Sequence, residues 1–160
     1  FIRCFNVLKF ENLELVLCGR IPPATLKLIS GNPKIKQLGF LSEAELHQVC
    51  SKVDAFINPR PEGVEGGETN FPSKILEFLP FGKMIISTIT PGLAPYYKDV
   101  LYCYQSNELD TLKNTLAMLS TMSDAEAAAI KTKTDSFLYE YKNNELIKKQ
   151  LVDWMNGFVN

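Results

Sequence analysis

The residues best suited to chemistry lie in one loop-like stretch, residues 59–71, and in the segment that follows it. The stretch PRPEGVEGGETNF holds three glycines, three glutamates, Arg60 and Asn70 within thirteen residues. Connections of this length without structure of their own are usually functional or disordered. The residues from Phe71 to Glu77 then have the pattern of a helix start, so the loop leads directly into the beginning of a helix.

The expected helix start has several features of an anion-binding site. Pro72 fits the first turn of a helix, where the N–H groups of Ser73 and Lys74 have no partner inside the helix. Free N–H groups and the positive end of the helix dipole together attract phosphate. Lys74 adds a full positive charge at an end where a cation otherwise destabilises a helix. The alternative is an ordinary surface ion pair between Lys74 and Glu77, three residues further on.

Glu77 lies between Leu76 and Phe78, and we expect it to be partly covered. A carboxylate near a bound phosphate is repelled unless it accepts hydrogen bonds from hydroxyl groups. A ribose diol offers such donors, so a phosphate and a ribose are a consistent pair of ligands for Lys74 and Glu77. Without such a ligand, Glu77 is an ordinary surface acid.

Other kinds of site are disfavoured by the motifs that the sequence lacks. No GxGxxG follows a predicted strand and no GxxxxGK[ST] occurs, which disfavours nicotinamide, flavin and P-loop nucleotide sites. The single histidine, His47, falls within a predicted helix, and we expect it to be structural or exposed.

The four cysteines (Cys4, Cys18, Cys50 and Cys103) form no CxxC pair and lie in apolar runs, which predicts reduced, buried thiols in a cytoplasmic protein. We therefore expect neither a metal nor a cofactor.

The composition is that of an ordinary globular domain. Of 160 residues, 46% are apolar and 22% are charged, and 17 basic against 18 acidic residues give a net charge of −1. A nearly neutral chain has no overall field to hold nucleic acid or an anionic membrane. Any binding of phosphate must therefore come from a local site.

The elements that would position such a site alternate between helix and strand. Up to residue 104 the pattern predicts a parallel sheet wrapped by helices on both faces, and beyond residue 107 it predicts helices only. In such sheets ligands bind in the loops at the carboxyl ends of the strands. We predict one domain over residues 1–160, with an α/β core over 1–104 and helices over 105–160, as a part of a longer protein. The expected helices up to residue 104 are 2–10 (with Phe5, Val7 and Leu8 toward the core), 23–30, 42–51 and 72–81, and the expected strands are 13–18, 35–38, 55–58, 84–88 and 100–104. Ser42 with Glu45, and Ser123 with Glu126, have the spacing of a capping box at a helix start.

The run NPRPEGVEGGETNFPSKILEFLPFGKMIIST resembles the nucleotide-sugar-binding half of retaining GT-B glycosyltransferases, similar to glycosyltransferase family four. The likeness rests on a strand ending in a proline-containing loop, a helix bearing Leu76-Glu77, then Gly82 and the apolar strand 84–88. The upstream runs LGFLS at 38–42 and VDAFI at 53–57 also have the family's spacing. The resemblance implies a doubly wound, Rossmann-like α/β fold, one half of a GT-B fold with extra C-terminal helices.

The resemblance also implies roles for particular residues. Glu77 corresponds to the glutamate that binds the ribose of the donor nucleotide. The diphosphate would be held at the helix start by Ser73 and Lys74. Gly39 and Phe40 correspond to the loop that contacts the base. Arg60, together with Asn70 and Phe71, completes the candidate nucleotide-binding set.

Two differences from the family pattern bear on activity. The family's first glutamate, eight positions before the second, falls on Thr69 here, and Glu68 is adjacent, so these two are the candidate donor-sugar contacts. The N-terminal acceptor-binding domain, the expected partner in catalysis, is not part of the sequence, so we expect this domain alone to be inactive.

These features lead to three hypotheses about the function. The first is the donor-binding domain of a glycosyltransferase that uses a UDP- or GDP-sugar, in bacterial cell-surface polysaccharide synthesis, with at most peripheral membrane contact. The second is a non-catalytic binding or scaffold module of the same fold, which Thr69 favours. The third is an unrelated doubly wound signalling domain, which would need an aspartate at a strand end, whereas Asp54 precedes its strand.

Overall fold

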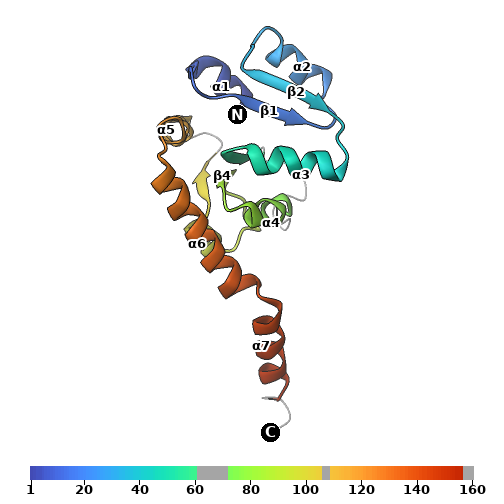
Figure 1. Ribbon diagram of the computed structural model, residues 1–160, viewed down its shortest axis with the longest axis vertical. Helices are drawn as coiled ribbons and strands as arrows, with labels where there is room; N and C mark the ends of the chain where they lie inside the picture. The colour runs from blue at the N-terminus through green and yellow to red at the C-terminus, as the bar shows by residue number, and fades with distance from the viewer. Residues whose placement is uncertain (61–71, 106–108, 157–160) are drawn as a thin grey trace.

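The computed structural model describes residues 1–60, 72–105 and 109–156. Helices and strands alternate as far as β5, and helices follow (Figure 1). The strands form two parallel sheets, one of β1 and β2 and the other in the order β3-β4-β5. The elements are α1 (Ile2–Leu8), β1 (Leu15–Cys18), α2 (Pro23–Ile29), β2 (Ile35–Gly39), α3 (Glu43–Lys52), β3 (Ala55–Asn58), α4 (Lys74–Phe78), η1 (Leu79–Phe81), β4 (Met84–Thr88), η2 (Pro95–Asp99), β5 (Tyr102–Tyr104), α5 (Leu109–Ser120), α6 (Asp124–Lys142) and α7 (Asn144–Asn156).

Strand β4 is the centre of its sheet, and all five of its residues are buried. A continuous apolar run of this kind is typical of a parallel strand that is covered on both faces. Because successive side chains point to opposite faces, Ile85 joins a core cluster with residues of α4, η1, η2 and α6, while Met84 and Ile86 join a second cluster with Leu112 and Leu116 of α5. Helices therefore cover both faces of this sheet.

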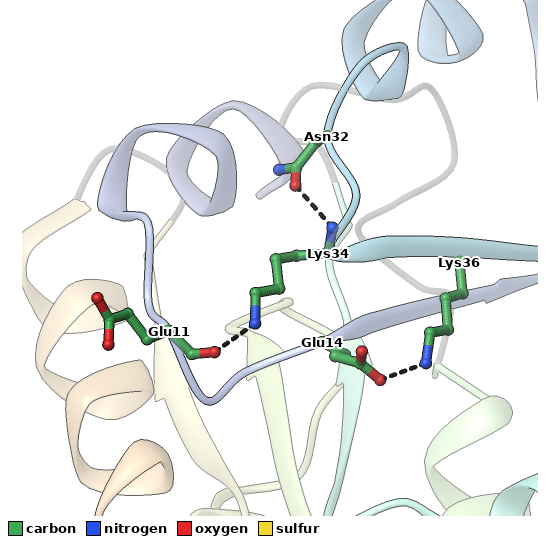
Figure 2. A network of polar contacts seen from close by, with 5 residues as sticks. All are labelled: Glu11, Glu14, Asn32, Lys34 and Lys36. Atoms are coloured by element: carbon green, nitrogen blue, oxygen red, sulfur yellow. Dashed lines mark hydrogen bonds and ion pairs between the residues drawn. The ribbon is translucent and has the colours of Figure 1, made fainter.

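The β1–β2 pair has its own small core. Leu15 and Ile35 pack with Phe5 of α1 and Ile29 of α2, and Leu15 lies opposite Ile35 in the parallel register. Polar contacts at the amino ends fix this register (Figure 2): Lys36 Nζ lies 2.7 Å from Glu14 Oε2 and Lys34 Nζ donates to the Glu11 carbonyl.

Two predicted helix starts are confirmed in detail. Ser42 accepts a hydrogen bond from the Glu45 N–H, and the Glu45 carboxylate accepts one from the Ser42 N–H, which is a complete capping box. Ser123 and Glu126 form the same arrangement at the start of α6. These hydrogen bonds lower the pKa of both glutamates.

Several predicted boundaries are wrong. Helix α1 ends at Leu8 rather than residue 10, and Val7 is 77% exposed instead of facing the core. Strand β5 begins at Tyr102 rather than residue 100, because the N–H groups of Val100 and Leu101 donate hydrogen bonds to the Tyr97 carbonyl and not to a neighbouring strand. The division of the chain at residue 104 stays a prediction.

The aromatic side chains of η2 and α6 hold the long helix against the core. Tyr96 stacks on Tyr141 with ring centroids 4.7 Å apart, and Phe137 lies against both Tyr97 and Tyr141. The Lys142 ammonium lies 5.2 Å from the centroid of the Tyr97 ring. Beyond this point α7 extends away from the sheets (Figure 1). In the described part of the chain, no helix is both long and apolar enough to cross a membrane.

Gly82 provides a test of the contact between the α4–β4 turn and α6. It adopts φ 60°, and a Cβ added there would lie 2.7 Å from Lys131 Cγ. We expect Gly82→Ala to lower the free energy of unfolding by more than the roughly 1–2 kcal/mol that left-handed backbone alone costs. Gly31→Ala is the matched control, since Gly31 has φ 83° and open space around it. Equal losses for the two variants in urea denaturation would show that Lys131 moves aside freely.

Candidate functional site

Three of the predicted site residues lie at or just after the carboxyl ends of strands. Strand β2 ends at Gly39, which adopts φ 65°, and the following Phe40 is 82% exposed. Strand β3 ends at Asn58, and Arg60 leaves it toward the segment that leads into α4. The N–H of Gly19, just after β1, donates to the Gly39 carbonyl at 2.6 Å, so the ends of β1 and β2 are joined at this edge.

A cluster of three buried polar residues fixes the carboxyl ends of β3 and β4. Asn58 Nδ2 donates to Ser87 Oγ at 3.0 Å, and the Arg60 N–H donates to Thr88 Oγ1 at 2.9 Å. Asn58, Ser87 and Thr88 are all buried. Sequence reasoning missed these three residues, although each is a polar residue at the end of an apolar strand. They do not face solvent; they fix where the backbone at Arg60 leaves the sheet.

The first turn of α4 presents Lys74 and Glu77 to solvent. Their side chains are 67% and 62% exposed, and Lys74 Nζ lies 3.9 Å from Glu77 Oε2. The surface ion pair considered as the alternative is therefore formed. Glu77 is exposed rather than partly covered, because the buried face of this turn is formed by Ile75.

Helix α4 is shorter than predicted. It starts at Lys74 and ends at Phe78, with η1 continuing to Phe81, so Pro72 precedes the helix and Ser73 is its N-cap. The Pro72 carbonyl accepts from the Ile75 N–H at 2.9 Å, which closes the first turn. Because a five-residue helix has a small dipole, attraction of an anion to this turn would depend mostly on the charge of Lys74.

Cys50 of α3 packs against the core cluster that contains Ile75 of α4. Burial is the main cause that raises the pKa of Cys50; the charges of Cys18 and Glu77 raise it further, whereas that of Lys74 lowers it. The prediction of buried thiols is wrong for Cys18, which is exposed; the other three are half-buried and all are free.

Comparisons with known proteins add one finding. No protein family and no curated protein matches the sequence. Among solved structures, the chain is similar to the Anabaena protein Alr3699/HepE, crystallised in complex with UDP and glucose, with a TM-score of 0.60 and 14% sequence identity. The alignment covers 98% of this chain and 44% of that one, so this chain spans less than half the length of the similar protein. The likeness shows the fold.

The predicted fold class is thereby confirmed. The chain is a Rossmann-like α/β unit of parallel sheets flanked by helices, matching one half of a GT-B fold. Gly39, Phe40 and Arg60 lie at or just beyond the carboxyl ends of β2 and β3, whereas Ser73, Lys74 and Glu77 lie at the start and along the first turn of α4. Glu68, Thr69, Asn70 and Phe71 fall outside the described residues, so the loop contacts stay predictions.

Two hollows of the described structure lie elsewhere, at the amino ends of the strands. One of about 230 Å³ is lined by Asp54, Gly82 and Lys131, and one of about 450 Å³ by Asn32, Lys34 and neighbouring residues. Polar groups of the second are bonded to one another: Asn32 Nδ2 donates to Asn6 Oδ1. The Lys34 N–H donates to Asn32 Oδ1, as Figure 2 shows. Both therefore fit structural roles better than the candidate site.

Groups suited to metal binding do not gather in the described residues. No cluster of three or more His, Cys, Asp or Glu side chains is positioned there to hold an ion. His47 is exposed, as expected, with its ring centroid 5.2 Å from that of Phe81.

Proposed function

We propose that this chain is the donor-binding half of a retaining glycosyltransferase, similar to family four, that takes a sugar from a nucleoside diphosphate sugar. The acceptor is a glycan or a lipid-linked glycan, in bacterial cell-surface polysaccharide synthesis at the cytoplasmic side of the membrane. The observation that carries the proposal is the exposed Lys74–Glu77 pair in the first turn of α4, in a fold similar to that of a protein solved with UDP and glucose.

The diphosphate binds at the first turn of α4. Lys74 supplies the positive charge, the N–H groups at Ser73 and Lys74 donate hydrogen bonds, and Arg60 approaches from the end of β3. Glu77 accepts hydrogen bonds from the ribose, which replaces its ion pair with Lys74. The 3.9 Å separation of that exposed pair supports this role, because both side chains are free to turn toward a ligand.

The remaining candidate residues surround this centre. Gly39 and Phe40 contact the base, and the left-handed backbone of Gly39 supports this role because it lets the chain turn sharply at the end of β2. Asn70 and Phe71 flank the diphosphate, while Thr69 and Glu68 contact the sugar.

Catalysis in this proposal is stabilisation of the departing diphosphate. Lys74 and the backbone donors oppose the negative charge that develops as the bond to the sugar breaks, and no metal or cofactor takes part. The acceptor is bound by a second, N-terminal domain, and the isolated chain does not transfer sugar.

A non-catalytic nucleotide-binding module is the second candidate function. Thr69, where the resembled family has a glutamate, favours it because threonine supplies no carboxylate to the donor sugar. The two candidates differ in whether a nucleoside diphosphate sugar binds more tightly than the nucleoside diphosphate itself.

The proposal is tested by a thermal-shift and ligand-observed NMR screen with UDP, GDP, ADP and CMP. Binding of one nucleoside diphosphate in preference to CMP supports the donor domain and names its base. A tighter complex with the matching sugar donor supports the enzyme, and equal affinity supports the module. Binding of none of the four would overturn the proposal for this chain.

Glu77→Gln separates the ribose role from a general effect of charge. Hydrogen bonds to a charged group contribute more than those to a neutral one, so we expect nucleoside diphosphate binding to weaken by about 1 kcal/mol, roughly fivefold. Inorganic pyrophosphate should bind as well as before or slightly better, because the substitution removes a negative charge near Lys74. Glu145→Gln, in the exposed Lys148–Glu145 pair of α7, is the matched control. Equal weakening for both ligands in calorimetry would contradict the ribose assignment.

A further inference from the structure

The larger of the two hollows lies between α1 and the connection from α2 to β2, and we call it the α1–α2 hollow. Its volume is about 450 Å³, within the range of roughly 300–1,000 Å³ that is typical of small-molecule sites. Phe10 and Leu28 contribute apolar wall, and Asn6, Ser30 and Asn32 contribute polar groups. Because it lies at the amino ends of β1 and β2, a ligand here would be separate from one at the first turn of α4.

Hydrogen bonds between its walls hold the α1–α2 hollow open. Asn6 Nδ2 donates to the Leu28 carbonyl at 2.6 Å, and Asn32 Nδ2 donates to Asn6 Oδ1 at 2.7 Å. The Lys34 N–H donates to Asn32 Oδ1 at 2.9 Å. These bonds tie α1 to α2 and to the start of β2, so the shape of the hollow is fixed before a ligand arrives, which lowers the cost of binding.

The Lys34 ammonium is held at this hollow without a carboxylate. Its Nζ donates to the Glu11 carbonyl, whereas the Glu11 carboxylate points to the other side of its own backbone (Figure 2). Glu14, the next acid along the chain, pairs with Lys36 at 2.7 Å. An ammonium has three N–H donors, so Lys34 keeps two for a ligand. Among the described residues, no ion pair neutralises its charge.

Lys9 brings a second positive charge to the α1–α2 hollow, and its backbone is strained. It ends α1 with φ 43° and ψ 47°, and in the described part of the chain no other residue except glycine has a positive φ. Glycine is the usual residue at such a helix end, because a Cβ makes this conformation unfavourable. Lysine here therefore costs stability, and its side chain lines the hollow. Backbone strain of this kind is found most often at ligand sites.

We propose that the α1–α2 hollow binds a small anionic sugar, with its phosphate or carboxylate group between the ammonium groups of Lys34 and Lys9. The sugar hydroxyls bond to Ser30 and Asn32, and the C–H face of the ring packs on Phe10. Asn32 Nδ2 uses one of its two N–H donors within the protein. Ser30 is exposed, and the described structure contains no hydrogen bond of its hydroxyl.

The size and the charge of the hollow select this class of ligand. A neutral sugar leaves both ammonium groups without a counter-charge, and inorganic phosphate fills only a small part of the volume. The site depends on residues 5–11 and 28–34 and not on the proposed donor site, so it would survive a failure to bind nucleotides.

The test is an NMR titration of the isotope-labelled chain with glucose-6-phosphate, glucuronate, glucose and inorganic phosphate. We expect chemical shift changes at the amides of Asn6, Asn32 and Lys34. At least one of the two anionic sugars should bind about tenfold or more tightly than glucose or phosphate, as expected for charged hydrogen bonds. Preference for glucose-6-phosphate indicates a sugar phosphate as the ligand, and preference for glucuronate indicates an acidic unit of a glycan.

Lys9→Gly separates binding from folding. We expect a higher urea midpoint, because glycine adopts the left-handed conformation without strain, together with an affinity that falls by about fivefold or more. Lys34→Gln should weaken binding by about tenfold. Lys36→Gln removes the same charge two residues away, from the exposed pair with Glu14, and is the matched control that should keep the affinity.

Four outcomes would overturn the proposal. The first is that neither anionic sugar shifts the amides of the hollow at millimolar concentration, and the second is that glucose or phosphate binds as tightly as both anionic sugars. The third is that the shifts are confined to the residues around Lys74, which would place the anion at the first turn of α4. The fourth is unchanged affinity in Lys9→Gly, or an equal loss in Lys34→Gln and Lys36→Gln.

Discussion

Ile75→Ala should lower the free energy of unfolding by about 2–5 kcal/mol, the range for a buried aliphatic side chain cut back to alanine. The Ile75 side chain is fully buried and packs in the cluster with Phe56 and Leu79. A helix as short as α4 is not stable by itself, so Ile75 and Leu79 hold it against the sheet. Urea denaturation followed by circular dichroism measures the loss.

Leu76→Ala is the matched control, because Leu76 is the next residue of the same helix and is 42% exposed. We expect a loss below about 1 kcal/mol for this variant, since little apolar surface returns to water. Similar losses for Ile75→Ala and Leu76→Ala would show that other contacts fix α4, and that Lys74 and Glu77 are positioned independently of this core.

Lys74→Ala should weaken binding of the preferred nucleoside diphosphate by about 1.5–3 kcal/mol, or roughly 10- to 150-fold. The reason is the loss of the charged donor nearest to the diphosphate at the first turn of α4. The folded state should change little, within about 0.5 kcal/mol, because the ion pair with Glu77 is exposed. Calorimetry at fixed salt concentration measures the change in affinity.

Lys148→Ala controls for the loss of an exposed lysine. Lys148 pairs with Glu145 three residues away at 2.9 Å and is 71% exposed, so its surroundings resemble those of Lys74. It lies on α7, which is not among the elements that form the candidate site. Unchanged affinity in Lys74→Ala, or an equal loss in Lys148→Ala, would remove Lys74 from the binding site.

Local sequence patterns predicted the central strands and the helix starts well. The predicted ranges 55–58 and 84–88 are also the observed bounds of β3 and β4. Short apolar runs bordered by polar residues and glycine leave little choice of where a strand begins and ends. Ser42 and Ser123 cap their helices as predicted, since the three-residue spacing to glutamate is itself the structural requirement.

The errors arise where a distant or competing contact decides the structure. The predicted helix 72–81 divides into α4 and η1 because Pro80 has no N–H to continue the helical ladder. Val7 lies two residues after the buried Phe5, and residues two apart point to different sides of a helix. The contact of Asn58 with Ser87 joins residues 29 apart in sequence, so only the pairing of β3 with β4 could reveal it.

The candidate site was predictable only in part. Its position at the carboxyl edge followed from the alternation of strands and helices, and the Lys74–Glu77 pair followed from helical spacing. The packing of Cys50 of α3 against the core cluster that contains Ile75 of α4 could not be predicted, because it joins residues far apart in sequence.

The projecting α7 implies that the chain does not unfold as a single unit. None of the side chains described on this helix is buried, and Ile147, Leu151 and Val152 are between 44% and 54% exposed. Little apolar burial means a small local opening free energy. Mild heating should therefore release α7 first, and a protease should trim the carboxyl end to a resistant fragment that keeps β3, β4 and β5 intact.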